Sequence, residues 1–114
     1  MKCILYFEFS EEQRDYLAKR TRNQYLLYDD KYREIHERQC FIDNVPITGD
    51  EISYKLEYCD LVFGIEGVVT RRLLSYFDTR RDNHESFYMI WIKVKDIECI
   101  TDMENLGEQE LSNN

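Results

Sequence analysis

Ser86-Phe-Tyr-Met-Ile-Trp-Ile-Lys-Val-Lys-Asp-Ile-Glu-Cys-Ile100 is the stretch that decides the fold. Successive side chains of a β-strand point to opposite faces, so Phe87, Met89 and Trp91 would share one face. The opposite face would hold four more apolar side chains, Tyr88, Ile90, Ile92 and Val94. A strand that is apolar on both faces needs cover on both, from its own chain or from a second copy. The alternation changes phase at Lys95-Asp96, which predicts a bulge or bend.

The chain upstream predicts a strand followed by a helix. Residues 2–9 are rich in aromatic and β-branched side chains and favour a strand. Ser10-Glu-Glu-Gln13 is a capping box, which marks the start of a helix. Apolar and aromatic residues then recur at helical spacing as far as Ile35, so the helix would lie within residues 11–38. A helix over that whole range would be about 42 Å long and would exceed the expected sheet, so it should either break near residues 21–24 or overhang the sheet at one end.

The middle of the chain predicts two more strands. Residues 40–47 read as a short strand, and Pro46 marks an edge or its end. Residues 52–58 alternate apolar and polar without error, so their polar side chains should face water. The alternative is a helix opened by a capping box formed by Thr48 and Glu51.

The next segment predicts a turn and a second helix. Gly64 and Gly67 would bracket the turn. Residues 68–81 would form the helix, with Val69 and Leu73 among the side chains on its inner face.

These elements predict an α+β fold in the order β-α-β-β-α-β. The economical arrangement is ferredoxin-like, with one antiparallel four-stranded sheet and two helices on one face. Right-handed crossovers would put the 86–100 strand at an edge, where its apolar faces favour a homodimer with Phe87, Met89 and Trp91 at the interface. The alternative is that a helix end or residues 97–106 fold over that strand. Residues 1–100 would be one domain, and residues 101–114 an acidic, flexible tail.

Composition bounds the class of protein. No apolar run approaches the roughly 20 residues of a membrane span, and Glu8 interrupts the N-terminal run, so we expect a cytoplasmic protein without a membrane segment. The four cysteines lie far apart, and three of them sit in apolar strand-like runs, which predicts reduced structural thiols rather than disulfides or a metal site. A single alanine, one proline and nine tyrosines are typical of AT-rich coding in phage or low-GC bacterial genes.

Catalytic and metal motifs are missing from the sequence. Neither His36 nor His84 adjoins a cysteine or serine in a nucleophile motif, so no catalytic residue, metal ligand or cofactor is predicted. The main basic concentration comprises Arg71, Arg72, Arg80 and Arg81. At helical spacing, part of it would hold a phosphate or an acidic side-chain cluster. The alternative is neutralisation by the neighbouring acids.

Two functions follow. The net charge of −8 argues against direct nucleic-acid binding and favours a basic protein partner. The first hypothesis is therefore a small acidic, non-enzymatic binding protein, such as an inhibitor or immunity-type antagonist, that occupies a basic, nucleic-acid-handling site on its partner.

The second hypothesis is a small ferredoxin-like nuclease or nucleotide-binding enzyme. Its Arg/His phosphate site would use Arg72, Arg80 and His84, and Glu8 or His84 would carry the proton. The alternative for Glu8 is an ion pair or solvent. A homodimeric structural subunit of a larger assembly is a third reading.

Overall fold

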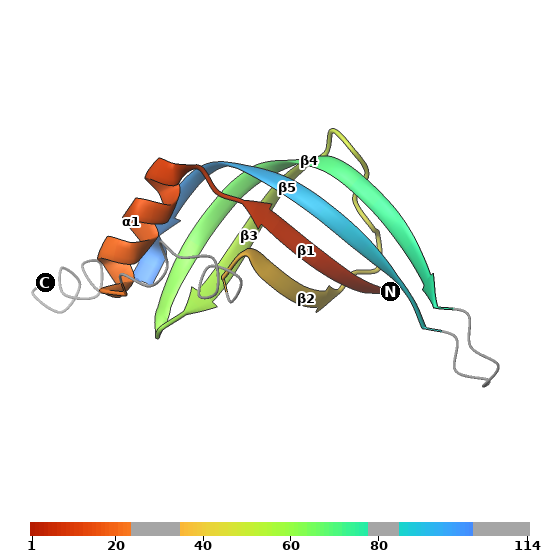
Figure 1. The fold of residues 1–114 in the computed structure, drawn as a ribbon, viewed down its shortest axis with the longest axis horizontal. Coiled ribbons are helices and arrows are strands. Elements are labelled where there is room, and N and C mark those ends of the chain that lie inside the picture. The colour runs from red at the N-terminus through yellow and green to blue at the C-terminus, as the bar shows by residue number, and fades with distance from the viewer. Residues whose placement is uncertain (24–34, 78–84, 102–114) are drawn as a thin grey trace, which may run out of the picture.

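The computed structural model of the chain describes residues 1–23, 35–77 and 85–101. These residues form five strands and one complete helix: β1 (Lys2–Glu8), α1 (Glu11–Thr21), β2 (Glu37–Phe41), β3 (Glu51–Tyr58), β4 (Leu61–Phe77) and β5 (Glu85–Cys99). The strands make a single sheet in the order β2-β1-β5-β4-β3. β1 and β5 are parallel, and the other neighbours are antiparallel. The sheet curls into a half-barrel, and α1 lies at one end of it (Figure 1).

The ferredoxin-like α+β prediction is therefore wrong. The sheet has five strands and is mixed, whereas four antiparallel strands and two helices were expected. The 86–100 strand is not at an edge, because β5 lies between β1 and β4 and pairs with both. The outer strands are β2 and β3. The central position gives β5 a neighbouring strand on each edge, but it does not cover both faces, since Phe87, Met89 and Trp91 stay partly exposed.

The largest local error is the helix predicted over residues 68–81, where the chain continues as β4 to Phe77. The cause is a bulge. Val69 pairs with Ile92, Arg71 pairs with Trp91, and the extra residue Thr70 shifts the register. Residues on one face are then three apart instead of two across the bulge, which imitates helical spacing. The expected turn at Gly64 and Gly67 is also wrong, since both glycines lie within β4.

Several local predictions are confirmed. β1 and β3 match the predicted strands, and the outward residues Ser53, Lys55 and Glu57 are exposed. The capping box is present, because the Ser10 side chain accepts from the Gln13 N–H and the Gln13 side chain accepts from the Ser10 N–H. α1 ends at Thr21, inside the expected break. The phase change in β5 is a bulge that leaves Lys95 unpaired in the register.

The remaining predictions differ or lie outside the described residues. The strand expected at residues 40–47 is found earlier, as β2. The continuation of the first helix over residues 24–34 and the acidic tail from residue 102 lie outside the described part. No helix among the described residues is long and apolar enough to cross a membrane.

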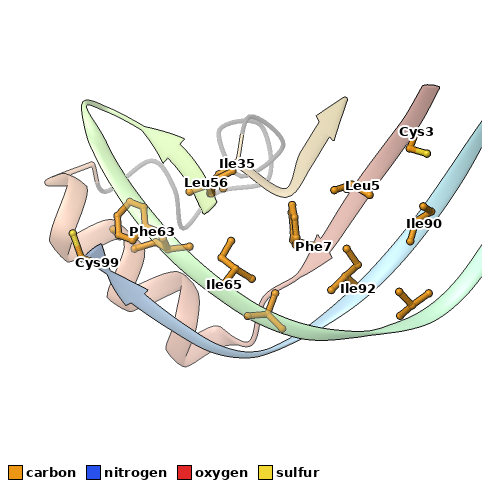
Figure 2. Packing of buried hydrophobic residues seen from close by; sticks show 14 residues of the cluster. Cys3, Leu5, Phe7, Ile35, Leu56, Phe63, Ile65, Ile90, Ile92 and Cys99 are labelled. Carbon is orange, nitrogen blue, oxygen red and sulfur yellow. The ribbon is translucent and has the colours of Figure 1, made fainter. Parts of the chain in front are cut away.

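The hydrophobic core lies on the concave side of the curled sheet (Figure 2). Phe7 from β1, Ile92 from β5 and Phe63 from β4 are each fully buried. Leu17 and Ala18 bring α1 onto this core, and the helix is tied to β5 by two side chains. Gln13 donates to the Val94 carbonyl at 3.1 Å. The Tyr16 hydroxyl accepts from the Cys99 N–H at 3.1 Å. The core therefore occupies the concave face of the sheet, and the convex face is not part of it.

Candidate functional site

The convex face of the sheet is the candidate site, and its centre is a row of four side chains that crosses four strands. Tyr6 of β1 lies opposite Glu37 of β2 and beside Trp91 of β5. Trp91 in turn lies opposite Arg71 of β4. The paired residues point to the same face, so all four side chains meet on the convex side. We call Glu37, Tyr6, Trp91 and Arg71 the aromatic row.

The aromatic row is held by contacts between successive members. The Tyr6 and Trp91 rings stack with centroids 5.1 Å apart and planes inclined by 18°. The Arg71 guanidinium carbon lies 4.8 Å from the Trp91 ring centroid, within the range of a cation–π interaction. Trp91 is thus contacted by a ring from β1 and a cation from β4. This is a rigid, amphipathic arrangement of the residue types that dominate protein–protein interfaces.

Burial and Glu37, which lies at the outer end of the row, make the Tyr6 hydroxyl less acidic. Burial raises the pKa of the Tyr6 hydroxyl, and the Glu37 carboxylate raises it further through its charge and through their hydrogen bond. The phenol therefore stays protonated to higher pH than a free tyrosine. In this form it donates to Glu37, which fixes its ring against Trp91.

Apolar side chains extend this face beyond the row. Ile4, Met89 and Leu73 lie side by side at the next level, two residues along their strands. Leu73 is 41% exposed, and Ile4 and Met89 are partly exposed. At the level after that, the Lys2 ammonium lies 5.9 Å from the Phe87 ring centroid. The predicted interface residues Phe87, Met89 and Trp91 are therefore brought together on one partly exposed face.

In the other direction along β5, Lys93 comes first on the convex face and acids follow it. Glu66 of β4 lies opposite Asp96 of β5, and Glu98 follows on the same face. Glu57 of β3 adds a further carboxylate. All four of these acids are exposed. Among the described residues, the convex face thus joins an aromatic half to a half in which acids outnumber the lysines Lys55 and Lys93, and we call this second half the acidic half.

A pocket lies beside the acidic half, where the β5 bulge opens the surface. Its volume is about 260 Å³. Its lining is Glu51, Ile52, Ser53, Glu66, Gly67 and Lys95. With two carboxylates against one ammonium, this lining suits a cationic side chain better than an anion.

The structure separates the arginines that were grouped from the sequence. Arg71 and Arg72 point to opposite faces of β4, and Arg72 lies over the Tyr88 ring at 4.3 Å. Arg80, Arg81 and His84 lie outside the described residues, so the anion site stays a prediction. Glu8 is exposed at the end of β1 and lies opposite Lys93. Because Glu8 faces the convex side and Arg72 faces the concave side, the structure does not bring this pair together.

The metal-ligating residue types are dispersed. No group of three or more histidines, cysteines or acids that could hold a metal ion occurs in the described part of the chain. The four cysteines are free; Cys3 and Cys99 are buried, and Cys59 is exposed. Burial raises the pKa values of Cys3 and Cys40, which lie opposite each other in the β1–β2 register.

Sequence reasoning missed Ile4, Tyr6, Glu37 and Leu73 as part of the convex face. The signal for Ile4 and Tyr6 was present, because residues 2–8 alternate and place these two on one side. Glu37 and Leu73 carried no such signal. Glu37 reaches this face only because β2 pairs with β1, and Leu73 only because β4 pairs with β5.

Comparison with known proteins finds no matching family model, no matching curated protein and no matching solved structure.

Proposed function

We propose that this chain is a binding protein that docks a basic protein partner against the convex face of its sheet. The observation that carries the proposal is the order of side chains along that face: the aromatic row is followed by Lys93 and then by the exposed acids Glu66, Asp96 and Glu98. Aromatic residues and arginine supply affinity in the centre of an interface, and surrounding charges select and steer the partner.

The charge of the protein supports a partner of opposite sign. The net charge is −8, and the acidic half of the convex face exposes part of it beyond Lys93, which follows Trp91 on that face. Basic surfaces on proteins are commonly the surfaces that bind nucleic acid. The proposal is therefore that this chain acts as an inhibitor or immunity-type antagonist, covering a nucleic-acid-handling surface of its partner. Four free cysteines fit a cytoplasmic location.

The test begins with capture of a partner from the native host and continues with the purified pair. Trp91→Ala should raise the dissociation constant roughly 30-fold or more, as expected of a central hot spot. Asp96→Lys should weaken binding most at low salt, because it reverses a charge on the steering surface. The matched controls are Ile47→Ala and Asp43→Lys, which change exposed residues of the segment after β2.

Competition provides the second measurement. Nucleic acid and this chain should exclude each other from the partner, and calorimetry or fluorescence anisotropy would show it. The proposal is wrong if the partner binds both at once, or if Trp91→Ala and Asp96→Lys bind as tightly as the two controls. Far-UV circular dichroism of each variant separates lost binding from lost folding.

A further inference from the structure

The outer edge of β4 is longer than the strand that pairs with it. β3 covers β4 only from Leu61 to Val68. The turn before β3 then satisfies both backbone groups of Val69. The Val69 carbonyl accepts from the Gly49 N–H, and the Val69 N–H donates to the Asp50 carbonyl. Beyond this point, no described strand lies along the outer side of β4. Figure 1 shows the C-terminal part of β4 and the start of β5 reaching past β3.

The register identifies the backbone groups that point out from this edge. Val69 directs its N–H and C=O outward, so its partner Ile92 directs its own groups toward β1. Ile90, Tyr88 and Ser86 lie two, four and six residues before Ile92 on β5, so their backbone groups also point toward β1. Their partners on β4 are therefore the residues that present outward groups: Arg72, Leu74 and Tyr76. The edge offers three donors and three acceptors with no partner in the described part of the chain.

The side chains of this edge do little to discourage pairing. Leu73 and Tyr76 are among the exposed large hydrophobic residues, at 41% and 77% exposure. Exposed edges are usually protected by lysine, proline or a bulge. Here the bulge precedes the open segment at Thr70, and between Arg71 and Phe77 the charges are confined to Arg71 and Arg72. The rest of the segment, residues 73–77, is uncharged and mostly apolar, as is typical of a strand that pairs on both edges.

We propose that the Arg71–Phe77 edge of β4 pairs antiparallel with the same edge of a second copy, with the twofold axis at Leu74. In this register Leu74 lies opposite Leu74, and Arg72 lies opposite Tyr76 of the second copy. Each of these pairs exchanges two N–H···O=C bonds, so all outward groups of both edges are satisfied. A symmetric pair of this kind is closed and cannot extend into a fibre through this edge.

Charge favours the antiparallel direction, and the pairing of all outward backbone groups sets the register. The antiparallel pair separates the two Arg72 side chains by four residues, about 14 Å, and places each opposite the exposed Tyr76 of the second copy, while its guanidinium also lies over the Tyr88 ring of its own copy. A parallel pair in register would set arginine beside arginine, which is unfavourable. The edge is therefore complementary to itself, and a second copy is the occupant we assign. The proposal is independent of the convex face, and it moves the predicted homodimer contact from the 86–100 strand to its neighbour.

The experiment uses charge at position 76, which is exposed enough to change without disturbing the fold. Sedimentation equilibrium of the full chain should show a concentration-dependent dimer. Tyr76→Lys places a cation opposite Arg72 of the second copy and should raise the dissociation constant roughly fivefold, since each dimer holds two such contacts. Tyr76→Glu places an anion there and should leave the dimer as tight as wild type or tighter. Trp91→Ala, on the convex face, should not weaken it.

Amide hydrogen exchange measures the same contact residue by residue. The amides of Arg72, Leu74 and Tyr76 should exchange fast in dilute protein and become protected as concentration rises. Those of Leu73 and Ser75, which bond to β5, should be protected throughout. The proposal is overturned by a chain that stays monomeric at its highest soluble concentration, by equal effects of Tyr76→Lys and Tyr76→Glu, or by a dimer that Trp91→Ala dissociates.

Discussion

The ring of Tyr6 stacks on the ring of Trp91, with centroids 5.1 Å apart, although 84 positions separate the two residues in the chain. The parallel pairing of β1 and β5 produces this contact, because Tyr6 and Trp91 are direct neighbours in the register. Trp91 is the only tryptophan, so its fluorescence reports on this one site.

The first prediction concerns the ionisation of Tyr6. Burial first, and then the Glu37 charge and hydrogen bond, raise its pKa above the ordinary value of 10.0. Trp91 fluorescence should therefore be quenched by a transition whose midpoint lies above pH 10. A raised folded-state pKa means that Tyr6 stabilises the fold fully below pH 10, and that this contribution is lost as pH rises through the folded-state value.

Two variants check the assignment of that transition. Tyr6→Phe should abolish it. Glu37→Gln should lower its midpoint but leave it above that of a free tyrosine, because burial is the larger cause. An unchanged transition in Tyr6→Phe would mean that another tyrosine quenches Trp91. Circular dichroism at each pH identifies any unfolding.

The second prediction contrasts two phenylalanines on neighbouring strands. Phe7 is fully buried, whereas Phe41 is 85% exposed. Phe7→Ala should lower the free energy of unfolding by about 3–5 kcal/mol, since it leaves a cavity in the core. Phe41→Ala should change it by less than about 0.5 kcal/mol. Denaturant unfolding measures both, and equal losses would contradict the position of the core.

The third prediction uses the two glycines of β4. A Cβ at Gly67 would lie 2.6 Å from the Lys93 carbonyl oxygen, which is fixed in the ladder. At Gly64 it would lie 2.8 Å from Cδ1 of Ile100, the end of a side chain that can rotate. Gly67→Ala should therefore destabilise the fold by about 1–3 kcal/mol, and Gly64→Ala by clearly less. Thermal unfolding that ranks the two variants the other way would show that β4 and β5 pair differently.

The fourth prediction is a stabilising change in the β3–β4 turn. Cys59 and Asp60 both have positive φ, 53° and 61°, which is the backbone of a type I′ hairpin turn. Glycine adopts this conformation without the strain that a Cβ brings. Asp60→Gly should raise the free energy of unfolding by about 1 kcal/mol. Asp43→Gly is the control, because Asp43 is exposed and has no positive φ; a gain from both variants would point to charge instead.

The fifth prediction ranks the cysteines by their reactivity. Cys59 is exposed, and burial raises the pKa values of Cys3 and Cys40 above 9.0, which lowers their thiolate fraction at any given pH. At pH 8, iodoacetamide should modify Cys59 first and Cys40 more slowly, and it should spare Cys3 in the folded protein. Mass spectrometry of the wild type and of Cys59→Ser gives the order. Early modification of Cys3 would contradict its burial.

The sequence determined the elements whose hydrogen bonds or burial are local. Ser10 and Gln13 bond to each other's backbone within three residues, so the start of α1 was readable without the rest of the chain. The alternation of residues 52–58 was readable for the same reason, since one face of that strand meets water. The interface residues Phe87, Met89 and Trp91 were predicted from their alternation, and their role at an interface stays a prediction.

The tertiary structure alone decided which strands are neighbours. The bulge at Thr70 gave β4 the spacing of a helix, and only its pairing with β5 identifies it as a strand. The aromatic row and the open edge at Arg72, Leu74 and Tyr76 exist because of cross-strand register, which depends on contacts between residues far apart in sequence. Such contacts leave no periodic signal in one strand by itself, and for this physical reason the fold class could not be read from the pattern of elements.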